Sequence, residues 1–199
     1  GGFFSPDQPP RYIQVPTGPN STEEVPWGTF TVPVLEKTEI TFHQTENADY
    51  GAVFALSVTA PRKYKDVIQG LFTMVDEELA KSSIYRGKAI DGQDMPQFLS
   101  LDGVDPSKVI YSEDVMADLE ASIWGVFRYG EANAKVGLPT KRAILLAGPY
   151  GTGKSLAGYL TAREAVANGW TFIMVRPGRD DLMTSMQTAR LYQPACVFF

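Results

Sequence analysis

The alternation of apolar and polar residues changes its period along this chain of 199 residues. Residues 28–35, 39–44 and 50–60 alternate apolar and polar positions with a period of two, which predicts three β-strands. Residues 62–82 then place apolar side chains three and four positions apart, which predicts an amphipathic helix. Together these segments predict a small α+β unit in which one helix lies on a short antiparallel sheet.

The second half of the chain alternates predicted strands with predicted helices. The apolar runs with the length of buried strands are residues 109–111, 143–147, 170–175 and 195–199. The segments predicted to be helices are residues 112–129, 154–167 and 180–192. The first has its apolar residues on one face, the second ends at Asn168-Gly169, and Asp180 or Asp181 caps the third. This order predicts an α/β fold, a parallel sheet with helices on both of its faces.

Composition suggests how the chain is divided. Residues 1–26 are rich in Pro, Gly, Ser and Asn, which predicts a flexible N-terminal arm. Residues 27–100 are expected to form the small α+β domain, which would recognise a partner, and residues 101–199 the α/β domain. The boundary is expected between residues 82 and 107, because residues 90–97 have the composition of a linker.

Bulk composition narrows the classes of function. The chain is 44% hydrophobic and 21% charged, which is typical of a globular protein. Its net charge of −5 argues against a broad nucleic-acid-binding surface. No apolar run has the length of a membrane span and no signal peptide is visible, while the single cysteine, Cys196, suits a reducing compartment. These features predict a cytoplasmic protein without a membrane partner.

A glycine-rich stretch at residues 148–155 matches the phosphate-binding pattern G-x-x-x-x-G-K-[ST] at every fixed position. It lies between the predicted strand 143–147 and the predicted helix 154–167, the context that this chemistry needs. Glycines let successive backbone N–H groups turn toward an anion, and the helix N-terminus adds partial positive charge. The alternative is a glycine-rich turn that binds nothing, and the flanking elements argue against it.

The motif assigns roles to individual residues. Lys154, the expected catalytic residue, would reach the β- and γ-phosphates of ATP, and the Ser155 hydroxyl would ligate Mg²⁺. The residues expected at the phosphates are Gly148, Pro149, Tyr150, Gly151, Thr152, Gly153, Lys154, Ser155 and Leu156. ATP and Mg²⁺ are therefore the expected cofactors.

Residues 109–199 resemble the AAA family of ATPases, the branch that includes proteasomal ATPases, katanin and spastin. The likeness rests first on the helix that begins S-E-D-V-M-A-D-L at Ser112, and on the strand and loop A-I-L-L-A-G-P-Y-G-T-G-K-S, where Tyr150 replaces the usual proline. It rests also on the predicted strand 172–175 and on the A-R-L-Y-Q-P stretch that begins at Ala189. The resemblance implies an AAA-type P-loop NTPase sheet, of which this chain carries the N-terminal part.

The resemblance also implies further properties of the site and of the assembly. Val109, Ile110 and Tyr111 would lie against the adenine, although an ordinary buried strand explains these three residues equally well. The implied activity is that of an ATP-hydrolysing motor or chaperone that remodels a protein partner, built as a homo-oligomeric ring and in this family a hexamer. The sequence ends at Phe199, before the family's Walker B acids, so we expect weak nucleotide binding or no turnover by this chain alone.

Other classes of function share the same loop. One is another phosphoryl-transfer protein, either a kinase or a nucleic-acid motor, and the acidic composition disfavours the motor. Another is a scaffold that binds ATP without turnover. The connection at residues 175–189 is short and lacks an aromatic-Val-Gly sequence, which argues against peptide threading, and we interpret Arg176, Arg179 and Met183 as solvated turn residues.

Overall fold

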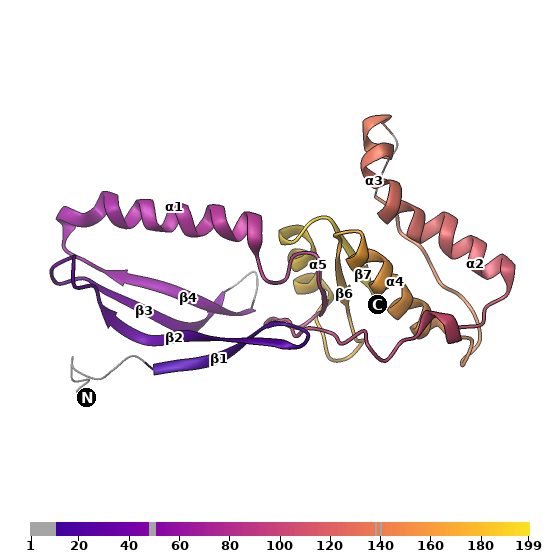
Figure 1. Ribbon diagram of the computed structural model, residues 1–199, viewed down its shortest axis with the longest axis horizontal. Coiled ribbons are helices and arrows are strands. Elements are labelled where there is room, and N and C mark those ends of the chain that lie inside the picture. The colour runs from indigo at the N-terminus through magenta and orange to yellow at the C-terminus, as the bar shows by residue number, and fades with distance from the viewer. Residues whose placement is uncertain (1–10, 48–50, 138, 140) are drawn as a thin grey trace. The chain divides into compact units, whose positions relative to one another are not determined.

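The chain forms two compact units, Gly1–Ile84 and Tyr85–Phe199. The computed structural model describes residues 11–47, 51–137, 139 and 141–199 (Figure 1). The division falls within the interval that the sequence indicated. Residues 85–100, which we expected in the first domain, belong to the second unit.

An antiparallel sheet of four strands in the order β1-β2-β3-β4 forms most of the first unit. Its strands are β1 (Arg11–Gly18), β2 (Ser21–Thr31), β3 (Glu39–Asn47) and β4 (Gly51–Thr59). The three predicted strands are confirmed, although β2 begins seven positions earlier than residue 28. The predicted flexible arm is wrong for β1 and the start of β2, because these residues pair with each other from Arg11↔Trp27 to Gly18↔Ser21. Residues 1–10 of that arm lie outside the described residues.

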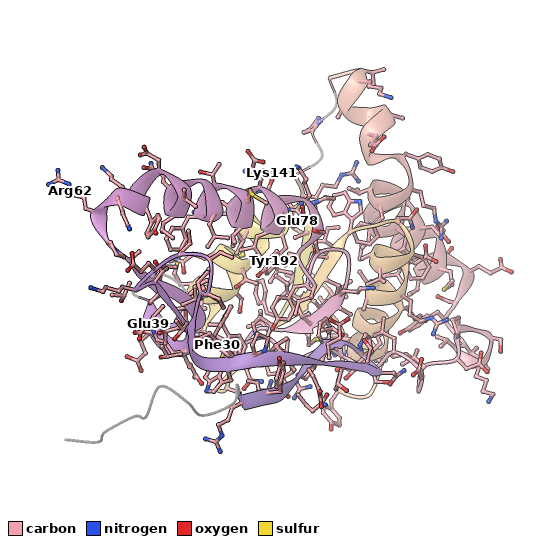
Figure 2. The ribbon with its side chains drawn as sticks, turned by 60° about the vertical axis from the view of Figure 1, so that its left-hand side comes forward. Phe30, Glu39, Arg62, Glu78, Lys141 and Tyr192 are labelled. Atoms are coloured by element: carbon pink, nitrogen blue, oxygen red, sulfur yellow. The ribbon has the colours of Figure 1, made fainter. Side chains whose placement is uncertain are left out.

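One helix covers a face of this sheet. The 3₁₀ turn η1 (Arg62–Tyr64) leads into α1 (Lys65–Ser82), which confirms the predicted helix. Figure 2 shows it running from Arg62 past Glu78, on one side of the strands that carry Phe30 and Glu39. The half-buried residues three and four positions apart along it are Tyr64, Ile68, Leu71 and Val75.

A parallel sheet in the order β5-β6-β7 lies at the centre of the second unit. Its strands are β5 (Ala89–Asp91), β6 (Thr171–Met174) and β7 (Ala195–Phe198), joined in part by α4 (Lys154–Ala167) and α5 (Leu182–Leu191). Side chains alternate between the faces of a strand. Phe172 and Met174 accordingly pack in the cluster that contains α4 residues, whereas Ile173 and Val175 pack in the cluster that contains Ala189 of α5. The predicted parallel sheet with helices on both faces is therefore confirmed.

The structure corrects which segments supply the strands. Residues 90–97, predicted to be a linker, begin within β5, whose three residues are all buried. Residues 143–147, predicted to be a buried strand, form no strand, and Leu145 is 89% exposed. Residues 109–111 likewise form no strand. A strand needs neighbours for its backbone N–H and C=O groups, and neither segment pairs with β5, β6 or β7.

A long helical segment packs beside α4. It consists of α2 (Glu113–Leu119), the π-helical turn η3 (Glu120–Trp124) and α3 (Gly125–Lys135), so the helix predicted at residues 112–129 is confirmed and extends further. The Ser112 side chain caps α2 by accepting a hydrogen bond from the Val115 N–H at 3.4 Å. Leu119, Trp124 and Phe127 bury their side chains in the same cluster as α4. Among the described residues, no helix combines the length and apolar character that crossing a membrane requires.

Candidate functional site

The candidate phosphate loop, residues 148–155, leads directly into α4. Gly151 and Gly153 have φ angles of 82° and 85°, in the left-handed region that residues with a Cβ atom rarely adopt. Gly153 is also the N-cap residue of α4. The loop thus ends at the N-terminus of a helix, where the first backbone N–H groups have no partner within the helix.

The Lys154 ammonium is folded over this loop. Its Nζ donates hydrogen bonds to the carbonyl oxygens of Gly148 at 2.8 Å and of Pro149 at 2.6 Å. Thr152 Oγ1 donates to the same Pro149 carbonyl at 2.9 Å. An ammonium has three N–H donors, so these bonds hold a positive charge at the loop and leave capacity for an anionic oxygen.

Other residues of the predicted site lie around the loop with different degrees of exposure. Tyr150 is fully exposed at its tip, and Ser155 is exposed in the first turn of α4. Leu156 is half-buried. Ser155 stays a predicted Mg²⁺ ligand; within the described ranges, no group of three or more His, Cys, Asp or Glu side chains could hold a metal ion.

The three residues of the expected adenine side are not equivalent in the structure. Val109 packs against the main apolar cluster, and Ile110 is 94% exposed. Tyr111 reaches the phosphate loop, where its hydroxyl donates to the Gly153 carbonyl at 2.7 Å. Burial raises the pKa of the Tyr111 hydroxyl. Of the three, the structure brings Tyr111 alone to the loop.

A cavity of about 590 Å³ opens beside the loop. One wall comes from α2 and η3, and the other from residues 144–149 with the start of α4. Its apolar wall is formed by Val115, Leu119, Ile123, Ile144, Leu145 and Leu146, and the side chains outside the loop that carry polar atoms are those of Tyr111, Asp118 and Ser122. Ligand pockets commonly measure about 300–1,000 Å³, so a nucleoside-sized molecule fits between these walls.

Polar contacts join the helical segment α2, η3 and α3 to α4. Trp124 Nε1 donates to Thr161 Oγ1 at 3.1 Å, with both residues buried. Arg128 forms ion pairs with Glu120 at 2.7 Å and with Glu164 at 2.8 Å. π-helical turns such as η3 are frequent at functional sites, and here the turn supplies Ser122 and Ile123 to the cavity.

A second polar cluster lies at the carboxyl ends of β5 and β6. Arg179 donates from Nη2 to Asp91 at 2.6 Å and from Nε to Asp180 at 2.8 Å. The side chains of Asp91 and Asp180 are 3% and 0% exposed. Arg179 is itself exposed, as are Arg176 and Met183, so all three are solvated as we interpreted them. Arg179 also pairs with two buried carboxylates, and Met183 lies in α5 and not in a turn. No local pattern could have paired Arg179 with Asp91, which lies 88 positions earlier in a three-residue strand.

Comparison with known proteins gives a weak but informative match. The chain is similar to Fidgetin of Mus musculus, with 24% identity over 202 aligned residues that cover 96% of this chain. Fidgetin is an AAA ATPase. The similarity points to the AAA ATPases.

The match covers only part of Fidgetin, and two other comparisons found no match. The chain spans 24% of the length of Fidgetin. No protein-family model matches the chain, and no solved structure matches it.

Proposed function

We propose that residues 148–156 bind the phosphates of ATP, with the Lys154 ammonium against the β- and γ-phosphates. The observation that carries this proposal is the position of Lys154, whose Nζ already lies within 2.8 Å of two loop carbonyls. The left-handed Gly151 and Gly153 lead into the N-terminus of α4, so backbone N–H groups and a cation face the same space. That combination suits a polyphosphate.

The Ser155 hydroxyl would ligate Mg²⁺ in this site. Its place in the first turn of α4, next to Lys154, brings a neutral oxygen ligand close to the phosphates. The bound ion would neutralise part of the phosphate charge. The hydroxyl would orient the ion, while Lys154 would hold the phosphate oxygens.

The cavity beside the loop would take the nucleoside. Val115, Leu119 and Ile123 offer an apolar surface to the base, and Asp118 and Ser122 offer oxygen atoms to its polar groups. Ile110 is 94% exposed, and of the three expected adenine-side residues Tyr111 alone lines the cavity. The nucleotide would thus lie along α2, with its phosphates at the start of α4.

For the protein that contains this chain, we propose ATP hydrolysis of the AAA type, used to remodel a protein partner or assembly. The similarity to Fidgetin supports this proposal. Copies would assemble into a ring, which in this family is a hexamer. The first unit, with its four-stranded sheet and α1, would recognise the partner.

The test is the substitution Lys154→Ala, measured as ATP affinity in the presence of Mg²⁺ and as ATP turnover by the intact protein. We expect affinity to fall by roughly tenfold to a hundredfold, because a hydrogen bond to a charged group contributes about 1.5–3 kcal/mol, and turnover to be lost. Lys135→Ala, which removes an exposed lysine at the end of α3, is the matched control. Equal ATP affinity in Lys154→Ala and Lys135→Ala would overturn the proposal.

A further inference from the structure

The Gly153 carbonyl oxygen accepts two hydrogen bonds. The Ala157 N–H donates at 2.9 Å, which is the first backbone bond of α4. The Tyr111 hydroxyl donates at 2.7 Å from a position 42 residues earlier in the chain. A carbonyl oxygen has two lone pairs, so its capacity is filled and the Gly153–Lys154 peptide is held from two sides.

The orientation of that peptide decides where the Lys154 N–H points. In a trans peptide the N–H is antiparallel to the C=O, so a restraint on the Gly153 oxygen is also a restraint on the Lys154 nitrogen. Helical carbonyls point toward the C-terminus of a helix and N–H groups toward its N-terminus. Gly153 is the N-cap of α4, so the Lys154 N–H faces the loop.

The Tyr111 ring also restricts the residue at position 153. A Cβ atom built on Gly153 would lie 2.9 Å from Tyr111 Oη and 3.1 Å from its Cε1. The ring therefore lies directly against the glycine and fills the space that a side chain would need. Contact and hydrogen bond act on the same backbone unit, whose φ of 85° is in the left-handed region.

We propose that Tyr111 is a positioning residue of the phosphate loop, which orients the Gly153–Lys154 peptide so that its N–H meets a phosphate oxygen. This inference rests on the proposed function of the loop. It gives Tyr111 a task different from the contact with the adenine that the resemblance implies. The tyrosine acts on the polyphosphate through Gly153.

The segment that carries Tyr111 is itself fixed. Val109 packs against the main apolar cluster, and Ser112 caps α2. Leu119, at the end of α2, is 4% exposed. Tyr111 is thus held between anchored neighbours, and its hydroxyl links the start of α2 to the start of α4.

The experiment compares Tyr111→Phe with the unchanged protein, using ATP, inorganic tripolyphosphate and adenosine as ligands of the intact protein. Phenylalanine keeps the ring against Gly153 and removes the hydroxyl alone. We expect the affinities for ATP and tripolyphosphate to fall by the same factor, about threefold to tenfold, as for one neutral hydrogen bond. The affinity for adenosine should not change. Tyr129→Phe, at an exposed tyrosine of α3, is the control.

A second measurement separates positioning from general stability. In the protein without ligand, the backbone amide resonance of Lys154 should shift in Tyr111→Phe. The midpoint of thermal unfolding of Tyr111→Phe should equal that of the control, Tyr129→Phe.

The outcomes distinguish this inference from the function on which it rests. If the unchanged protein binds neither ATP nor tripolyphosphate, the proposed function fails and the inference with it. If it binds both, and Tyr111→Phe binds tripolyphosphate as tightly while losing affinity for ATP and adenosine, Tyr111 contacts the base and only the inference is overturned.

Discussion

Gly158 of α4 lies against the ring of Phe198 in β7: a Cβ atom built on the glycine would be 2.9 Å from both Cε1 and Cζ of that ring. The two residues belong to the helix that begins at the phosphate loop and to the last strand of the parallel sheet. A helix can approach a sheet this closely where it presents no side chain. The position of α4, and with it the start of the loop, therefore depends on this contact.

We expect Gly158→Ala to lower the free energy of unfolding. Overpacking a close contact costs about 1–3 kcal/mol, and the gain from alanine in a helix is about 1 kcal/mol. Denaturation by urea, followed by circular dichroism, measures the change.

The matched control for that substitution is Gly70→Ala in α1, where a Cβ atom would meet nothing within 4 Å. Helix propensity alone predicts a gain of up to about 1 kcal/mol there. If both substitutions stabilise the protein equally, the close contact between Gly158 and Phe198 does not exist.

A pH dependence is expected from Asp180. Burial alone would raise the pKa of its carboxyl, but hydrogen bonds from the Arg179 guanidinium and the Arg176 N–H outweigh burial and lower the pKa below 3.8. A carboxyl whose pKa is lower in the folded than in the unfolded state stabilises the protein above the unfolded pKa, near 4. That stabilisation is lost as the pH falls through the folded pKa.

Asp180→Asn should therefore reduce the free energy of unfolding by about 1–3 kcal/mol at pH 7, the range for a buried group that loses a charged partner. The difference from the unchanged protein should shrink as the pH is lowered from 5 to about 3. Urea denaturation at a series of pH values measures it, with Asp76→Asn on the exposed side of α1 as the control. A difference that is constant from pH 3 to pH 7 would show that the ionised carboxylate has no part.

Local sequence patterns predicted the elements whose signal lies in their own residues. The apolar residues of α1 recur at helical spacing, α4 follows the glycine motif, and β6 is a mostly apolar run between turn residues. These features are local, so the sequence pattern alone predicts the elements.

Segments whose structure depends on distant partners could not be predicted in this way. Residues 143–147 are as apolar as β6, yet they form no strand. Conversely, β5 has three residues, too few to show a period, and it becomes a strand because it pairs with Phe172 and Ile173 more than 80 positions later. Strand formation reflects the neighbours as much as the residues themselves.

The candidate site likewise has parts that a local motif predicts and parts that depend on contacts between distant residues. The glycines and Lys154 follow from one contiguous motif, so their type and spacing predicted a phosphate-binding loop before a helix. The contact between Tyr111 and Gly153 joins residues 42 positions apart. The ion pairs of Arg179 likewise depend on how the carboxyl ends of β5 and β6 meet. Both required the folded structure.

Backbone amide hydrogen exchange, measured with and without ATP and Mg²⁺, tests most directly whether the loop binds the phosphates. The account predicts slower exchange across residues 148–157 on addition of ATP, greater there than in any other segment of the chain, because N–H groups bound to phosphate oxygens are protected. At the same ATP concentration the protection should be weaker in Lys154→Ala, because its affinity for ATP is expected to be lower. If ATP binds and exchange at residues 148–157 is unchanged, the phosphates lie elsewhere and the account is contradicted.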